Sequence, residues 1–329
     1  MKTYNRQRPA FGRRHVQGLS LIELMISLVL GLLVVGAAIS VFFSNGQTYR
    51  ATESLGRVQE NARVAFELMA HDVREAAGNP CGRNLPIANV IENATTQWFT
   101  NFTDGVRGVD GAFAQADPAN RVANTDAIEL LSGEGMGVTV ASHVPSSATF
   151  HLSTADHDLV ADDVLMACDS RQAAIFVMSG PNATNETVVH NTGSAAIKNC
   201  TKGLGVPVAC TTLGTPYEFG PNSMLVKLRA VRWYVGTNGR GGNSLYRTTL
   251  RGNATAPEEI TEGVEDMQIT YLLPGSSTYV AAAAVGTRWK EVLAARIDVS
   301  LEGAERVGTA GEVIERQLTH VVTLRNRNA

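Results

Sequence analysis

The chain has 329 residues, of which 44% are hydrophobic and 18% are charged, and its formal net charge is −3. This length and apolar content allow one sizeable folded core and a separate anchoring segment. The first 18 residues carry +5 and no acid, so the rest of the chain sums to −8. A basic head on an acidic body is not typical of a nucleic-acid-binding protein and indicates a targeting head instead.

The segment that follows the basic head is apolar. Leu19–Phe43 is a run of 25 residues with one charge, Glu23, and a helix of this length can cross the roughly 30 Å hydrocarbon layer. The positive-inside bias puts residues 1–18 in the cytoplasm and the body outside. An ordinary secretory signal has a shorter apolar core and is cleaved after it. Here the candidate cleavage residue, Gly18, precedes the apolar run.

Glu23 is the sharpest feature of this segment. A carboxylate at membrane depth costs roughly 2.5 kcal/mol or more, so it usually has a partner. If the mature chain begins at Leu19, Glu23 lies one helical turn from a free α-amino group. The amine that neutralises Glu23 belongs either to the same chain or to a neighbouring subunit. In the second case, the attraction would bring each new helix into register with its neighbour. The alternative is that Glu23 snorkels to the headgroup region.

The run from Gly18 to Glu23 and beyond, Gly-Leu-Ser-Leu-Ile-Glu-Leu-Met-Ile, resembles the signal of type IV prepilins and secretion pseudopilins. The resemblance implies that a prepilin peptidase cleaves after Gly18, that Leu19 becomes N-methylated, and that Glu23 guides assembly. Two positions depart from the pattern: Leu19 stands where phenylalanine is commonest, and Ser40 stands where major pilins often have a helix-bending proline. The second departure argues against a major pilin.

The pattern becomes amphipathic after Phe43. Apolar residues recur at steps of three and four, which is typical of a helix. They are Leu55, Val58, Ala62, Ala65, Phe66, Met69, Val73, Ala76 and Ala77. Polar residues, among them Asp72, are expected on the other faces, and Gly78-Asn79-Pro80 ends the helix. The sequence therefore predicts one helix from about Ser20 to Ala77, with a transmembrane or filament-core part over 19–43 and an amphipathic part over 44–78.

The remaining residues, 79–329, have short strand patterns separated by turn-rich segments. The predicted strands are 126–131, 138–144, 164–167, 173–179, 224–235, 244–250, 265–272, 296–301 and 318–324. The glycine-rich turn 236–243 predicts a hairpin, and 92–125 and 180–223 are predicted to be long loops. The fold prediction is α+β and pilin-like: a long N-terminal helix packed on a C-terminal antiparallel β-sheet domain with long loops.

All four cysteines follow the apolar run, and they form no C-x-x-C pair. A zinc ribbon or thioredoxin-like motif is therefore not indicated. A body outside the cytoplasm favours two disulfides. Of the three pairings we favour Cys200–Cys210, which closes a short loop, together with Cys81–Cys168; buried free thiols are the alternative.

The later segments resemble a narrower family, the PilW minor pilins. The segments that carry the resemblance are Leu165–Asp169, Arg232–Gly236, Ser244–Arg247, Glu259–Tyr271, Trp289–Lys290, Ala295–Leu301 and the terminal Val-Thr-Leu-Arg-Asn-Arg. The resemblance implies a low-abundance subunit that helps to initiate a type IV pilus near its tip and supports twitching motility and adhesion. The partners implied are the prepilin peptidase, other minor pilins, the major pilin, the inner-membrane assembly platform and a tip adhesin. The implied location is the inner membrane before assembly and the cell-surface pilus afterwards.

Chemistry-bearing patterns are weak. The acidic run 156–163 lacks the glycine and terminal glutamate of an EF-hand loop. His143, His151 and His157 match no zinc spacing, and there is no nucleophile elbow. We therefore expect no enzyme activity, no cofactor and no metal.

Two alternatives to a pilus subunit remain at the level of sequence. One is a minor pseudopilin of a type II secretion system, which has the same leader and fold. The other is a membrane-tethered module that binds DNA or a host surface through basic residues. These residues are Lys227, Arg229, Arg232, Arg240, Arg247 and Arg251. The polar face of a hairpin explains them better, so we expect no specific nucleic-acid partner.

Overall fold

The computed structural model describes residues 20–82, 85–100, 102, 104–181, 185–193, 197–252, 254–303, 305–306 and 312–327. The predictions for Gly18 and Leu19 lie outside the described residues. The chain divides into two compact units, Met1–Glu53 and Ser54–Ala329, and we call the second unit the body.

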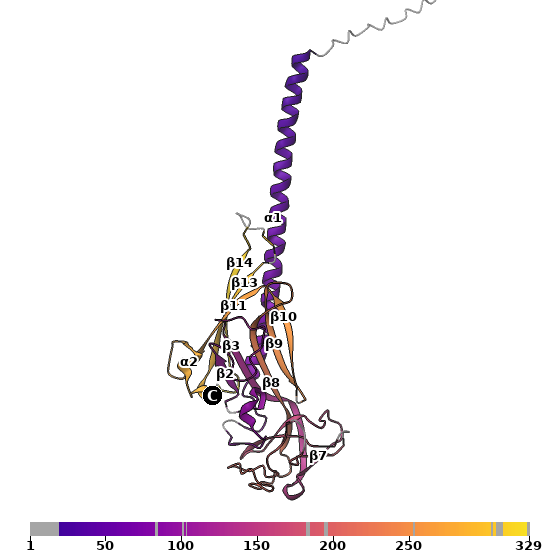
Figure 1. The fold of residues 1–329 in the computed structure, drawn as a ribbon, viewed down its shortest axis with the longest axis vertical. Helices are drawn as coiled ribbons and strands as arrows, with labels where there is room; N and C mark the ends of the chain where they lie inside the picture. Colours follow the sequence, from indigo (N-terminus) through magenta and orange to yellow (C-terminus); the bar gives the residue numbers. More distant parts are fainter. Residues whose placement is uncertain are drawn as a thin grey trace, which may run out of the picture. The chain divides into compact units, whose positions relative to one another are not determined.

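One long helix, α1, spans Leu21–Glu75 (Figure 1). It begins where the hydroxyl of Ser20 accepts the backbone N–H of Glu23 at 3.2 Å, which satisfies one of the free donors of the first turn. It ends where Ala77 takes a left-handed conformation with φ of 59° and the N–H of Gly78 bonds to the carbonyl of Glu75 at 3.1 Å. The long helix predicted from the apolar periodicity is therefore present, with ends close to the predicted ones.

Two sheets make up the rest of the body. Among the described residues the larger sheet has ten strands in the order β1-β6-β5-β8-β3-β4-β7, with β2 beside β3, β9 beside β8, and β10 beside β9. The strands are β1 Ile87–Asn89, β2 Val106–Val109, β3 Ala127–Val144, β4 Thr149–Leu152, β5 Val164–Cys168, β6 Ala173–Val177, β7 Thr187–Val189, β8 Met224–Thr237, β9 Asn243–Arg251 and β10 Ala254–Glu262. The pairings are antiparallel except β1 with β6.

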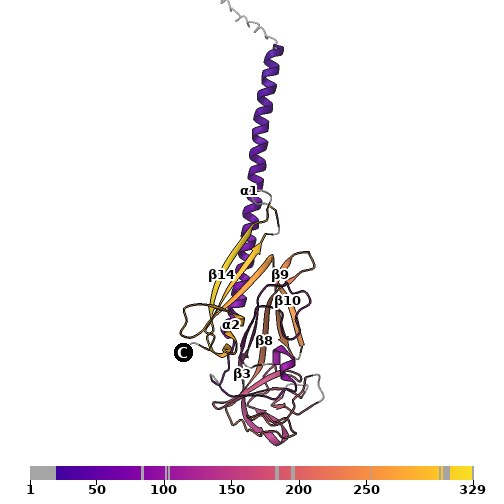
Figure 2. The ribbon, with the colours of Figure 1, turned by 60° about the vertical axis from the view of Figure 1, so that its left-hand side comes forward.

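The smaller sheet has the order β12-β11-β13-β14 and is antiparallel throughout. Its strands are β11 Val264–Leu272, β12 Val280–Ala281, β13 Ala294–Glu302 and β14 Glu315–Thr323. The short helix α2, Ala282–Val285, follows β12, and four 3₁₀ turns lie at Ala94–Thr96, Trp98–Thr100, Pro145–Ser147 and Trp289–Glu291. Figures 1 and 2 show β14 on one side of the body and β10 on the other.

The second part of α1 contributes one apolar stripe to the main core. Ala62, Met69 and Val73 are almost completely buried and share a cluster with Trp233 of β8 and Ile297 of β13. This is the stripe that the three-and-four periodicity predicts, and it holds both sheets against the helix.

The predicted strands correspond to strands of the structure with one merger and several omissions. Residues 126–131 and 138–144 are parts of a single strand, β3, whose register against β8 shifts between Glu134 and Val138. Gly137 allows that irregularity, because it has φ of 73° and a Cβ there would lie 2.5 Å from Val226. The hairpin between β8 and β9 is present. The strands that the sequence patterns missed include β2 and β7, which lie in the predicted loops, and β10.

Two disulfides cross-link the body with the favoured pairing. Cys81, after the end of α1, bonds to Cys168 at the end of β5, and their Cα atoms are 5.7 Å apart. Cys200 and Cys210 close a short loop with a Cα separation of 5.0 Å.

Candidate functional site

The first part of α1 exposes its apolar side chains on all sides. The large apolar side chains of Leu21–Phe43 are at least half exposed, from 50% for Ile39 to 80% for Leu21. An 18-residue window of α1 has a mean hydropathy of 2.7, so the helix is long and apolar enough to cross a membrane. Such a surface needs lipid or other apolar helices around it.

The polar side chains in this part are satisfied within the helix. The hydroxyl of Ser27 donates to the carbonyl of Glu23 at 2.7 Å, and that of Ser40 donates to the carbonyl of Ala37 at 2.9 Å. In an apolar surrounding such internal bonds remove the cost of an unpaired hydroxyl. The segment is therefore suited to lipid except at one side chain.

That side chain is Glu23. It is the only Asp, Glu, Lys or Arg in the described part of the apolar segment, residues 20–43. Its backbone N–H bonds to Ser20, whereas its carboxylate has no ion-pair or hydrogen-bond partner among the described residues. The geometry leaves this carboxylate available to a cation at the start of the helix.

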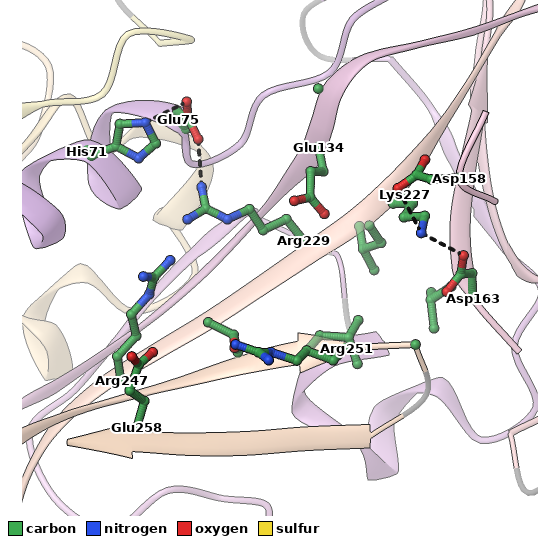
Figure 3. A pocket seen from close by; sticks show the side chains of 16 residues that line it. His71, Glu75, Glu134, Asp158, Asp163, Lys227, Arg229, Arg247, Arg251 and Glu258 are labelled. Atoms are coloured by element: carbon green, nitrogen blue, oxygen red, sulfur yellow. Dashed lines mark hydrogen bonds and ion pairs between the residues drawn. The ribbon is translucent and has the colours of Figure 1, made fainter. Parts of the chain in front are cut away.

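The body contains a charged groove that the sequence patterns did not indicate. Its volume is about 700 Å³, and it lies between the end of α1, the faces of β8 and β9, and the segment before β5 (Figure 3). The charged and titratable residues that line it are His71, Glu75, Glu134, Asp158, Asp163, Lys227, Arg229, Arg247, Arg251 and Glu258. Cations and anions alternate along it, so the groove has no single sign of charge.

Arg229 and Arg247, which line the groove, also contact Asp72, and this residue ties α1 to the sheet. It is 3% exposed and accepts from Arg229 at 2.5 Å, from the indole N–H of Trp233 at 2.9 Å, and pairs with Arg247 at 3.1 Å. Glu75, one turn later, pairs with Arg229 at 2.6 Å. The periodicity put Asp72 outside the apolar stripe but did not indicate its burial, which is tolerated because several donors converge on the carboxylate.

Elsewhere in the groove, Lys227 pairs with Asp158 and Asp163, each at 3.1 Å. Burial disfavours the charged ammonium, but the hydrogen bonds that it donates to the two carboxylates outweigh this effect and raise the pKa of Lys227. Two members of the acidic run 156–163 are thus neutralised by a cation. Among the described residues no group of three or more His, Cys, Asp or Glu side chains is arranged to hold a metal ion.

The six basic residues considered for nucleic-acid binding do not form one exposed patch. Arg232 is 2% exposed and pairs with Glu129 at 2.6 Å; burial lowers its pKa against the opposing effect of Glu129. Arg240, on the surface, pairs with Glu259 and Glu262. With Lys227, Arg229 and Arg247 paired in the groove, only Arg251 of the six lacks an ion-pair partner among the described residues.

His143, one of the three histidines considered as ligands, is buried against a fourth, His190. Their Nε2 atoms are 2.9 Å apart, and the N–H of Phe219 donates to Nδ1 of His143 at 3.3 Å. In neutral His143 the proton is therefore on Nε2, and this N–H donates a hydrogen bond to Nε2 of His190. Burial lowers the pKa of His143 to about 4 and that of His190 to about 3, so the pair is neutral at physiological pH.

The comparisons with known proteins match both ends of the chain. A prokaryotic N-terminal methylation motif matches residues 13–39, and the family of type IV pilus-assembly protein W, PilW, matches residues 232–323. The two matches support the resemblance of the chain to the PilW family of type IV pilus-assembly proteins. No curated protein shows a significant match to the sequence.

A type IV-like pilin from Thermus thermophilus is among the similar solved structures, with 10% sequence identity and a TM-score of 0.32. The comparison covers 83% of this chain and 98% of that chain. The methylation motif contains Gly18, Leu19 and Glu23, and the PilW region runs from β8 to the end of β14. The α+β prediction and the resemblance to PilW pilins are confirmed.

Proposed function

We propose that the protein is a structural minor pilin that helps to initiate assembly of a type IV pilus near its tip and thereby supports twitching motility and adhesion. The observation that carries this proposal is the single carboxylate of Glu23 in an otherwise apolar helical segment, within a match to the methylation motif. A carboxylate at that depth usually has a specific partner that compensates its cost.

The proposed processing supplies that partner. A prepilin peptidase cleaves between Gly18 and Leu19, and the new amino group of Leu19 is methylated. The amine of a neighbouring subunit then meets Glu23, and the attraction sets the axial register of the incoming helix. The basic residues before Gly18 hold the leader in the cytoplasm, so the body is exposed in the periplasm and later on the pilus. The two disulfides suit that oxidising location.

The proposed domain organisation follows from this processing. Residues 1–18 are the removed leader, 19–43 the transmembrane and filament-core helix, 44–78 the amphipathic helix, and 79–329 the β-rich body.

The partners are the peptidase, the assembly platform, the major pilin, other minor pilins and a tip adhesin. A minor pseudopilin of a type II secretion system is the second candidate, favoured by the same motif; loss of secretion without loss of pili in a deletion strain would select it.

Mass spectrometry of the chain from membranes, and pilus counts in variant strains, test the proposal. We expect a mature chain that begins at methylated Leu19, and loss of that form in Gly18→Ala. We expect Glu23→Ala to be cleaved normally but to reduce piliation, with partial recovery in Glu23→Asp. Ser27→Ala is the matched control, because it removes another polar side chain of the segment without removing charge. Normal piliation in Glu23→Ala, or a mature chain that keeps its basic head, contradicts the proposal.

A further inference from the structure

The two sheets end in two long edge strands, β10 and β14, and the two differ in composition. Each has nine residues and one strand neighbour among the described residues. The remaining edge strands β1, β2, β7 and β12 have two to four residues. Of the edge strands that the structure describes, only β10 and β14 are therefore long enough to form an extended ladder with another polypeptide.

β10 carries the devices that prevent such pairing. Pro257 lies near its centre and has no N–H to donate, and acidic side chains follow at Glu258, Glu259 and Glu262. Prolines and charges on an edge strand oppose the addition of another strand.

β14 lacks these devices over its last six residues, after the charged Glu315 and Arg316 at its start. Its sequence from Leu318 to Thr323 is Leu-Thr-His-Val-Val-Thr, with no proline and no Asp, Glu, Lys or Arg. β-branched residues fit a pleated strand well. The outward side chain of Val321 is 49% exposed, and no described strand covers it.

The hydrogen bonds at the ends of β14 show which backbone groups are free. The N–H of Gly303 bonds to the carbonyl of Ile314, and the N–H of Leu324 bonds to that of Leu293, both at 2.9 Å. The register of β14 against β13 is continuous between these bonds, and in an antiparallel ladder bonded and non-bonded pairs alternate. The residues whose N–H and C=O groups point away from β13 are therefore Glu315, Gln317, Thr319, Val321 and Thr323.

We propose that β14 binds an extended segment of a different polypeptide, which adds to the smaller sheet as an antiparallel strand. The nine residues of β14 extend over roughly 30 Å, and the five open residues offer main-chain bonds along that length. Like β14, the bound segment is uncharged along its middle. Its residues alternate: apolar ones lie beside Leu318 and Val322, and small polar ones lie beside Thr319.

The direction of β14 excludes the β14 strand of a second copy as the antiparallel strand within one filament. The start of β14 lies near Ser54, because a Cβ on Gly303, the partner of Ile314, would be 2.6 Å from its hydroxyl. The end lies near Arg74, whose carbonyl accepts the N–H of Arg325 at 3.3 Å. β14 thus runs in the direction of α1. Subunits stacked head to tail in a filament share one orientation, so another copy presents β14 in parallel; this step rests on the proposed function.

Peptide binding to the detergent-solubilised full chain tests the inference. The probe is a fluorescent synthetic peptide of alternating valine and threonine with a lysine at each end, and the readout is fluorescence anisotropy. We expect saturable binding that Val321→Pro weakens at least tenfold and that Val321→Thr leaves unchanged. The proline removes an N–H that no described residue uses, so the unfolding temperature should stay close to that of the wild type; Gln317→Pro is the second variant if it does not.

Equal binding by the wild type and both proline variants, or no binding by the wild type, overturns the inference. Self-association of the wild type that is lost in Val321→Pro would show that a second copy occupies the edge, and would overturn the choice of occupant. These measurements need no pilus, so their failure leaves the assembly role of Glu23 standing.

Discussion

The two parts of α1 differ in where their apolar side chains lie. In Leu21–Phe43 they are exposed around the whole helix, and in the part that belongs to the body they are confined to one buried stripe. The two parts also treat a carboxylate differently: Glu23 has no partner among the described residues, whereas Asp72 has three donors from the sheet. The rest of the chain buries the apolar side chains of the body part. Those of the first part stay exposed to whatever surrounds the chain.

The largest expected effect is at Asp72. Asp72→Ala leaves Arg229 and Arg247 without their buried carboxylate and Trp233 without an acceptor. Breaking a buried ion pair by removing one partner costs about 3–5 kcal/mol, so urea unfolding of the body should shift by this amount. Asp72→Asn, which keeps the acceptor for Trp233, should lose less. A stability equal to that of the wild type in Asp72→Ala would show that the network does not fix α1 to the sheet.

Met69→Ala is expected to cost about 3 kcal/mol, because Met69 is 0% exposed in the core between α1 and the sheets. Val64→Ala is the matched control: Val64 lies on the same part of the helix but is 43% exposed, and it should change the free energy of unfolding by less than about 0.5 kcal/mol. Similar losses in the two variants would mean that the stripe is not what holds the body together.

The sequence predicted the local features of the fold and missed the long-range ones. The helix, the β8–β9 hairpin and most strands follow from periodicity and turn residues, which act over a few positions. Asp72 and Trp233 are 161 residues apart, and no local pattern pairs them. β10 was missed because Pro257 argues against a strand, and the structure accommodates it at an edge.

The same limit applies to the candidate sites. Glu23 stands out in the sequence because its neighbours in the chain are all apolar, so its cost is evident without a fold. The groove draws its charges from α1, β3, the segment before β5, and β8 to β10. Whether basic residues form an exposed patch or a set of ion pairs depends on acidic partners far away in the sequence. Glu129, the partner of Arg232, is an example.

Acid should lower the free energy of unfolding of the body, because the body contains the buried histidine pair. The first part of α1 contains no such pair. The pKa of His143 is lowered from 6.5 to about 4 in the folded state, so its contribution to stability is complete above pH 6.5 and is lost as the pH falls toward 4. By pH 5 the loss from His143 is about 2 kcal/mol. Urea unfolding at pH 7 and pH 5 measures it, and His143→Gln should reduce the difference. An unchanged difference in that variant would exclude His143 as its source.

The smallest expected effect separates the two parts of α1 most cleanly. Leu32 is 65% exposed and belongs to the apolar part, so Leu32→Ala should leave the unfolding of the detergent-solubilised body within about 0.5 kcal/mol of the wild type. The apolar surface of Leu32 is available only to lipid or neighbouring helices, so the substitution should instead lower the yield of filaments. A body destabilised by Leu32→Ala as strongly as by Met69→Ala would mean that both parts of the helix support one core. The exposed segment would then be part of the folded body and could not serve as a surface reserved for assembly.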